Sequence, residues 1–256
     1  MPFTLTHIAG ILPIAAIWRG VPFSALVIGC VIPDLRLFLP IGPHYGITHS
    51  FVGVPTACVP MGLVAFVLFQ NLVKVPVMSL LPTLVQQRLA FCALPLRTWA
   101  MEFWIRVVIG IAMGAVTHVV WDAFTHQGRW GVQWFPVLDA SVEFAGFSLP
   151  GFKALQYGSS VVFLPLMTVA FAWWLRQRPV MPLSGLCEMP PLIRVLIGLV
   201  LIGGAMVVGW RDATFEEYGI YRMTFRLVTT GGATFVVSVC LFAVGFHSVT
   251  RGRFLS

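Results

Sequence analysis

Six residues that could ligate a metal ion lie in or beside apolar segments of this chain. They are four of its six histidines and two of its four aspartates: His7, Asp34, His49, His118, Asp122 and His126. Ionisable side chains at membrane depth are energetically costly, and by default they indicate a functional site. Imidazole and carboxylate are also common ligands of divalent metal ions. These residue types therefore predict a buried site for a divalent metal.

Three of the six residues are spaced four apart, in the order His118-x-x-x-Asp122-x-x-x-His126. On an α-helix, residues four apart differ by about 40° around the axis and by ~6 Å along it. We therefore expect the three side chains to form one narrow stripe on a transmembrane helix. Such a stripe can present ligands to one or two adjacent ions, and the central Asp122 could bridge two of them.

Each of these residues, taken alone, also has a plainer explanation. A single histidine within a membrane is more often a hydrogen-bonded packing residue than a ligand, and Asp34 could form a turn or cap after Pro33. A threonine precedes four of the six histidines, at positions 6, 48, 117 and 125. Each hydroxyl could bond the helix backbone or orient the neighbouring ring from outside a metal site. The sequence leaves both roles open.

The composition requires lipid as the solvent for much of the chain. Of the 256 residues, 58% are hydrophobic and only 10% are charged, with a mean hydropathy of +0.91. Soluble domains carry roughly 25% charged residues, so a soluble fold of this size could not cover so much apolar surface. The net charge of +7 comes from basic residues scattered at segment ends, which is typical of membrane loops. We predict an integral membrane protein whose partner is the lipid bilayer and not nucleic acid.

The apolar segments predict an all-α fold, a polytopic transmembrane helix bundle. Five segments approach or reach the ~20 residues needed to cross a bilayer: 51–69, 104–125, 157–175, 192–210 and 227–247. Residues 8–18 and 21–33 form two shorter apolar runs. They predict either a hairpin of two short helices, or one short helix and a span extended to residue 39.

Basic residues indicate which connections face the cytoplasm. They gather, with few acidic residues, in 70–100, 176–194 and the tail 251–253. The positive-inside rule therefore places these regions and the C-terminus in the cytoplasm, and the six candidate ligands near the outer face. We expect residues 70–100 to be a linker along the membrane interface. We treat the chain as a single integral-membrane domain, 1–256, in which 1–176 carry the site and 177–256 add two transmembrane helices.

Several blocks of the sequence carry a resemblance to a known family. They are MPFTLTH, SALVIGCVIPDL, ITHSFVG, HVVWDAFTH and LQYGSS. Together they resemble an uncharacterised family of bacterial integral membrane proteins, a domain of unknown function, over nearly the whole chain. That family is in turn distantly similar to inner-membrane metal-dependent hydrolases. The resemblance implies a location in the bacterial cytoplasmic membrane.

A wider similarity is to zinc-dependent phospholipase C, an all-helical enzyme whose ligands follow the order His, Asp, His, His-x-x-x-Asp, His. This similarity implies zinc as the metal. It implies one ion held by Asp34, His49, His118 and Asp122, a second held by His7 with Asp122, and a third position for His126. The enzyme's later His-x-x-x-Glu pair has no counterpart after His126, although Asp139, Glu143 or Glu216 could substitute for it. We therefore expect one or two ions.

The leading functional hypothesis is a metal-dependent hydrolase of phosphoester or phospholipid substrates. Asp34 or Asp122 would orient the nucleophile, and Arg36 or Arg129 would hold the phosphate, although a charge on a loop is more often simply solvated. Two alternatives stay open. One is a metal or proton-coupled transporter. The other is a non-catalytic membrane scaffold with a structural metal site.

Overall fold

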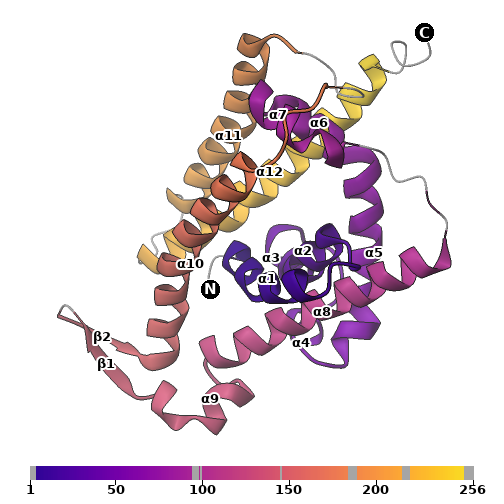
Figure 1. Cartoon of the computed structure of the whole chain (residues 1–256). Helices are drawn as coiled ribbons and strands as arrows, with labels where there is room; N and C mark the ends of the chain where they lie inside the picture. Colours follow the sequence, from indigo (N-terminus) through magenta and orange to yellow (C-terminus); the bar gives the residue numbers. More distant parts are fainter. Residues whose placement is uncertain are drawn as a thin grey trace. The chain divides into compact units, whose positions relative to one another are not determined.

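In the residues that it describes, the computed structural model is mostly helical, with one short hairpin (Figure 1). It describes residues 4–93, 98, 100–144, 146–183, 189–214 and 220–250. Glu216, Arg97 and the basic tail 251–253 lie outside the described residues. The chain divides into two compact units. Unit 1 comprises Met1–Arg36, Ile41–Phe66 and Thr98–Trp173, and unit 2 comprises Leu37–Pro40, Val67–Arg97 and Trp174–Ser256.

Among the described residues, five helices are long and apolar enough to cross a membrane, which confirms the five predicted spans. They are the helical run Val54–Leu80, α8 (Met101–Thr125), α10 (Gly151–Arg176), α11 (Pro191–Thr214) and α12 (Ile220–Thr250). The prediction of an all-α polytopic bundle is therefore confirmed, and the chain is an integral membrane protein.

The first of these helices is longer than its apolar segment predicted. α5 (Val59–Leu68) continues through a π-helical turn, Phe69–Val73, into α6 (Lys74–Leu80). The prediction of a linker from residue 70 was therefore wrong as far as residue 80. Pro76 has no N–H to donate to the carbonyl of Leu72 four residues earlier. In its place, the ring of His247 from α12 donates to that carbonyl, with Nε2 and O 3.0 Å apart.

The two N-terminal apolar runs form short helices, α1 (Ile8–Ile17) and α2 (Phe23–Val31). The chain does not continue as one span, because α2 ends in a 3₁₀ turn, Ile32–Asp34, before the single-turn helix α3 (Leu35–Phe38). A second single-turn helix, α4 (Tyr45–Thr48), follows in unit 1. These short turns place polar residues close to the long helices.

Within unit 1, α2 lies directly against α8. A Cβ on Gly114 of α8 would lie 2.2 Å from the carbonyl oxygen of Leu26 and 2.6 Å from the backbone nitrogen of Cys30. Glycine at this position therefore allows the two backbones to touch. The contact also brings the carbonyl of Cys30 beside His118, which lies one turn further along α8.

The segment between α8 and α10 contains α9 (Trp130–Trp134), a 3₁₀ turn, Pro136–Leu138, and a hairpin of two short strands. β1 (Ser141–Phe144) pairs antiparallel with β2 (Phe147–Pro150), and Ser141 is opposite Pro150. Gly146, with φ +81°, supplies the left-handed residue of the hairpin turn.

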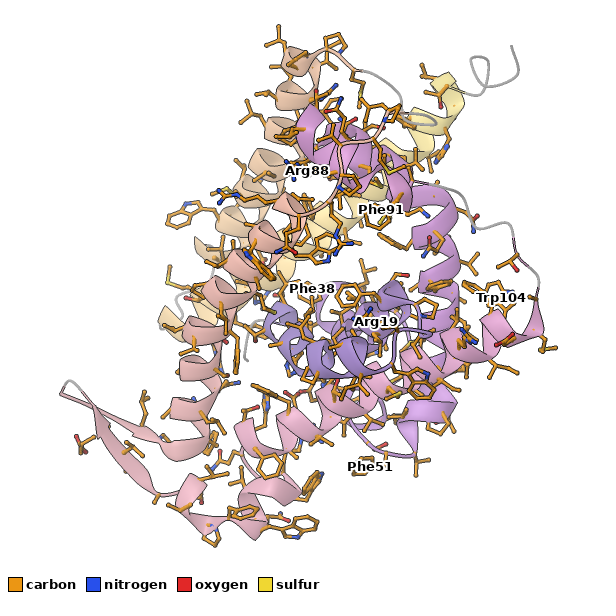
Figure 2. All side chains as sticks on the ribbon, in the orientation of Figure 1. Arg19, Phe38, Phe51, Arg88, Phe91 and Trp104 are labelled. Carbon is orange, nitrogen blue, oxygen red and sulfur yellow. The ribbon has the colours of Figure 1, made fainter. Side chains whose placement is uncertain are left out.

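Unit 2 combines α6, α7 (Thr83–Leu89), α11 and α12. α11 and α12 pack closely side by side, because a Cβ on Gly209 would lie 2.7 Å from the carbonyl oxygen of Leu227. Arg88, labelled in Figure 2, ties α7 to the end of α10 by donating to the carbonyl of Leu175 over 3.0 Å.

Candidate metal centre

Four separate segments of unit 1 bring five of the six predicted ligands into one buried cluster. His7 ends the 3₁₀ turn Thr4–His7, Asp34 ends the turn after α2, His49 follows α4, and His118 and Asp122 lie one turn apart on α8. All five side chains are buried, with exposed fractions of 0 to 4%. We call these five residues the His/Asp cluster.

The first half of the cluster is formed by Asp34, His49 and His118. Asp34 Oδ1 lies 3.3 Å from His49 Nε2 and 3.7 Å from His118 Nε2. The two Nε2 atoms are 3.2 Å apart. A carboxylate oxygen and two ring nitrogens thus face one another across a space that could hold one metal ion.

The second half is formed by His7, His118 and Asp122, and these three groups could also hold an ion. Asp122 divides its oxygens between the two halves. Its Oδ1 lies 3.5 Å from His7 Nε2, whereas its Oδ2 lies 3.4 Å from His49 Nε2 and 3.5 Å from His118 Nε2. The ring of His7 is stacked on that of His118, with centroids 3.9 Å apart.

Backbone carbonyls determine which ring nitrogens face the cluster. His118 Nδ1 lies 2.7 Å from the carbonyl oxygen of Cys30, and His49 Nδ1 lies 3.1 Å from that of Tyr45. A carbonyl can only accept, so both Nδ1 atoms carry a hydrogen and donate it. In the neutral rings, both Nε2 atoms then present lone pairs to each other at 3.2 Å. Two lone pairs cannot bond each other, and two N–H groups would repel. The pair therefore fits a positive charge between the rings, supplied either by a metal ion or by one shared proton.

Three further atoms of the cluster are buried without a hydrogen-bond partner in the described part of the chain. They are His7 Nδ1, Asp34 Oδ1 and Asp122 Oδ1. A buried carboxylate oxygen without a partner is costly, and a metal ion would compensate both oxygens. Burial, with the neighbouring His118, lowers the pKa of His7 to about 3, so this ring is neutral at pH 7 and able to ligate.

His126 stands at the edge of the cluster and not within it. α8 ends at Thr125, and His126 has an extended backbone, φ −130° and ψ 135°. The prediction of three ligands along one helix was therefore wrong for its last member. The ring nevertheless turns back so that Nδ1 lies 3.3 Å from Asp122 Oδ1, while Nε2 lies 3.3 Å from the side-chain amide of Gln156.

A comparison with protein families gives a match over most of the chain. A family model described as a domain of unknown function, DUF4184, matches residues 1–244. The chain belongs to the DUF4184 family. The predicted resemblance to an uncharacterised family is thereby confirmed. No curated protein and no solved structure matches the DUF4184 chain.

Two of the four Thr-His pairs of the DUF4184 chain combine both roles that the sequence left open. Thr48 Oγ1 lies 3.1 Å from His49 Nδ1 and donates to the carbonyl of Pro33 over 2.9 Å. Thr125 Oγ1 lies 3.2 Å from His126 Nδ1. By contrast, the hydrogen bond described for Thr117 is donated to the carbonyl of Gly114 in its own helix.

The two arginines predicted to hold phosphate differ in their positions. Arg129 donates from Nη1 to the carbonyl of His49 over 3.2 Å, so it lies beside the cluster. Arg36 is exposed and donates to the carbonyl of Gly42 over 2.8 Å. Asp139 and Glu143, the suggested replacements for the missing His-x-x-x-Glu pair, are exposed and belong to neither described group of ligands.

Sequence reasoning missed two side chains that contact the cluster. Tyr45 stacks on His49 with centroids 3.7 Å apart, and its hydroxyl lies 3.5 Å from Asp122 Oδ2. Its i, i+4 spacing to His49 was the available signal. Burial and the negative charges of Asp122 and Asp34 raise the pKa of Tyr45, so the phenol keeps its proton. Thr4 donates to Asp34 Oδ2 over 2.7 Å, and no sequence pattern indicated it.

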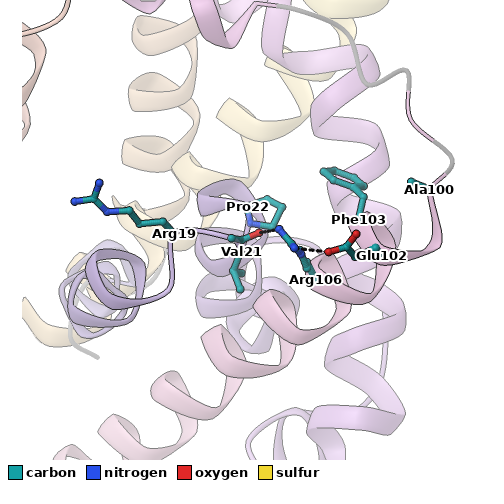
Figure 3. A pocket seen from close by; sticks show the side chains of 8 residues that line it. Arg19, Val21, Pro22, Ala100, Glu102, Phe103 and Arg106 are labelled. Atoms are coloured by element: carbon teal, nitrogen blue, oxygen red, sulfur yellow. Dashed lines mark hydrogen bonds and ion pairs between the residues drawn. The ribbon is translucent and has the colours of Figure 1, made fainter.

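A pocket of about 260 Å³ lies at the opposite end of α8 from the cluster (Figure 3). Its lining residues are Arg19, Gly20, Val21, Pro22, Ala100, Glu102, Phe103 and Arg106. Arg106 forms an ion pair with Glu102, and the side chain of Arg19 points away from the pair (Figure 3). None of the six predicted ligands lines this pocket.

Proposed function

We propose that this DUF4184 protein is a membrane-embedded, metal-dependent hydrolase of phosphoester substrates, with phospholipids as the natural class within a bilayer. The observation that carries the proposal is the 3.2 Å approach of His49 Nε2 and His118 Nε2, each with its Nδ1 bonded to a backbone carbonyl. Rings held in this way are arranged as metal ligands are, with a backbone acceptor fixing the tautomer.

The proposed cofactor is one or two divalent ions, with zinc as the expected metal. Asp34, His49 and His118 would hold one ion. His7 and Asp122 would hold the second, with His126 beside them, and Asp122 would contribute to both sites. A bound divalent ion lowers the pKa of water and stabilises negative charge on phosphate oxygens.

The residues of the chain would position the substrate and the attacking water. Asp34 and Asp122 are the proposed catalytic carboxylates, since each has a buried oxygen without a hydrogen-bond partner among the described residues. Arg129 is the better placed of the two proposed phosphate-binding residues, because it already contacts the backbone of His49. A role for Arg36 would require its side chain to leave Gly42.

The proposed location is the bacterial cytoplasmic membrane, with the C-terminus in the cytoplasm and the site near the outer face. The distribution of basic residues supports this orientation. We retain the single domain 1–256, in which 1–176 carry the site and 177–256 supply two further transmembrane helices. In support, all six predicted ligands belong to unit 1, and α11 and α12 belong to unit 2.

A structural metal site in a non-catalytic scaffold is the second candidate. The specific observation in its favour is burial, because the most exposed residue of the cluster, His49, is only 4% exposed. Structural sites are fully coordinated by protein, whereas catalytic sites keep an open position. A transporter has less support, since the ligand groups found in the described residues gather at one place and not along a path.

Metal content is the decisive test. The full chain would be purified in detergent after growth with zinc or manganese, and metal per chain would be measured by elemental mass spectrometry. Asp122→Asn and His49→Gln should lose the metal. Asp212→Asn is the matched control, because Asp212 lies in unit 2 and is hydrogen-bonded to Thr230. One or two ions in the wild type and in the control support the site.

Hydrolysis separates the two candidate functions. A metal-loaded wild type would be assayed with bis(p-nitrophenyl) phosphate and with phospholipid in mixed micelles. Turnover that disappears in Asp122→Asn supports the hydrolase. A folded wild type without metal would overturn both candidates, and a metal-loaded protein without turnover on either substrate would favour the scaffold.

A further inference from the structure

Two side chains from different segments stand at the margin of the His/Asp cluster and are partly exposed. Tyr45 begins α4 and Arg129 precedes α9. The five cluster residues are buried, whereas Tyr45 and Arg129 contact the cluster and are partly exposed.

The position of Tyr45 is set by its stacking on His49. The two rings are 3.7 Å apart and inclined by 26°. The hydroxyl is thereby directed toward Asp122, whose Oδ2 lies 3.5 Å away. This is longer than the usual O–H···O distance of about 2.5–3.0 Å, so the phenol hydrogen is not strongly engaged and can turn to a nearer acceptor.

The position of Arg129 is set by Tyr45 and His49. Its guanidinium lies 5.6 Å above the Tyr45 ring, and Nη1 donates to the carbonyl of His49 over 3.2 Å. A guanidinium has five N–H donors in a planar fork, and the carbonyl of His49 takes one of them. The fork suits two oxygens of a phosphoryl group, which it can bind in parallel.

We propose that Tyr45 and Arg129 form an oxyanion-binding pair that holds the phosphoryl oxygens of a phosphate ester against the His/Asp cluster. The inference rests on the proposed function, because the pair binds the same substrate that the cluster would act on. The positive guanidinium also offsets the two carboxylates of Asp34 and Asp122, which would otherwise repel an anion. The ligand is either a soluble phosphate ester or the headgroup of a phospholipid.

The test is binding of inorganic phosphate to the metal-loaded full chain in detergent, measured by calorimetry. The variants are Tyr45→Phe, which removes only the hydroxyl, and Arg129→Gln. The control is Arg106→Gln, which removes an arginine from the far end of α8, where it pairs with Glu102. Arg129→Lys keeps the charge and removes the planar fork.

Loss of a hydrogen bond to a charged group weakens binding by roughly tenfold or more. Both Tyr45→Phe and Arg129→Gln should therefore weaken phosphate binding at least about tenfold, with wild-type metal content. Arg129→Lys should lie between the wild type and Arg129→Gln, and Arg106→Gln should match the wild type. Unchanged phosphate affinity in the two variants, or no phosphate binding by a metal-loaded wild type, would overturn the pair while leaving the metal site intact. A wild type without metal would overturn the pair together with the proposed function, and elemental analysis distinguishes that case.

Competition identifies the source of the phosphate. Glycerol 3-phosphate and a short-chain phosphatidic acid would each be used to displace inorganic phosphate. Stronger displacement by the lipid assigns the pair to a phospholipid headgroup, and equal displacement assigns it to soluble esters. Failure of both to displace phosphate would contradict an ester-binding pair.

Discussion

The two compact units differ in how the carboxylates among their apolar helices are bonded. In unit 2, the carboxylate of Asp212 accepts from Thr230 over 2.6 Å and pairs with Arg226 at 3.5 Å. In unit 1, the ion-pair partners described for Asp34 and Asp122 are histidine rings at 3.3 to 3.7 Å. Each of the two carboxylates also has one buried oxygen without a hydrogen-bond partner among the described residues. A carboxylate that is satisfied within the protein stabilises helix packing, whereas one that is left unsatisfied is costly unless a ligand completes it.

The histidines of the two units show the same difference. In unit 2, Pro76 has no N–H to bond the carbonyl of Leu72. His247 donates to that carbonyl in its place. His118 in unit 1 donates to the carbonyl of Cys30, and this bond leaves Nε2 directed at His49 and Asp122. The hydrogen bond of His247 satisfies a helix carbonyl, whereas that of His118 leaves its second ring nitrogen facing the cluster.

Removal of metal should give the largest change in stability, and this change should depend only on residues of unit 1. Ligand binding stabilises a fold by about 4 kcal/mol when the ligand is at a thousand times its Kd. A chelator should therefore lower the thermal unfolding midpoint of the wild type and of Asp212→Asn by several degrees. The midpoint of Asp122→Asn should not respond, since it would hold no metal to remove. An equal response of all three proteins would contradict a metal site at Asp122.

Close helix contacts should be the next most sensitive feature, in both units. Gly114→Ala would place a Cβ 2.2 Å from the carbonyl oxygen of Leu26, and Gly209→Ala would place one 2.7 Å from that of Leu227. Both neighbours are backbone atoms that cannot turn aside, so each variant should lose about 1–3 kcal/mol of stability. Gly203→Ala is the control, because nothing lies within 4 Å of its added Cβ. Unfolding in increasing denaturant measures all three, and only Gly114→Ala should also release metal.

His247→Ala should weaken unit 2 without affecting metal binding. The variant leaves the carbonyl of Leu72 without its donor, at a cost of roughly 1–2 kcal/mol. The helical run should then open around Pro76, which hydrogen exchange of residues 70–80 would detect. If exchange there were unchanged, the π-helical turn, and not His247, would be what stabilises the helix around Pro76. Metal content equal to the wild type separates this result from a loss at the cluster.

Hydropathy predicted the five spans because each depends only on a local run of apolar residues. The sequence also indicated the ligands, since His118 and Asp122 share one face of a helix by their spacing alone. It failed at features that depend on distant partners. Where the helix continues beyond residue 70, the carbonyl of Leu72 is bonded by His247, 175 residues away. Nδ1 of His118 is bonded to a backbone carbonyl 88 residues away. The sequence contains no pattern that would identify His247 as the donor to Leu72, or the carbonyl of Cys30 as the acceptor from His118.

The smallest effect should come from a matched pair of hydroxyls, one in each unit. Thr4 donates to Asp34 over 2.7 Å in unit 1, and Thr230 donates to Asp212 over 2.6 Å in unit 2. Loss of a hydrogen bond to a ligating carboxylate weakens metal binding by about 10–100-fold, so Thr4→Val should hold metal roughly tenfold less tightly in a chelator competition. Thr230→Val removes an equivalent bond that only joins two helices, and it should cost roughly 0.6 kcal/mol of stability with metal affinity unchanged. If Thr4→Val behaved like Thr230→Val, then Asp34 would be a packing residue as Asp212 is, and the contrast between the two units would not extend to metal binding.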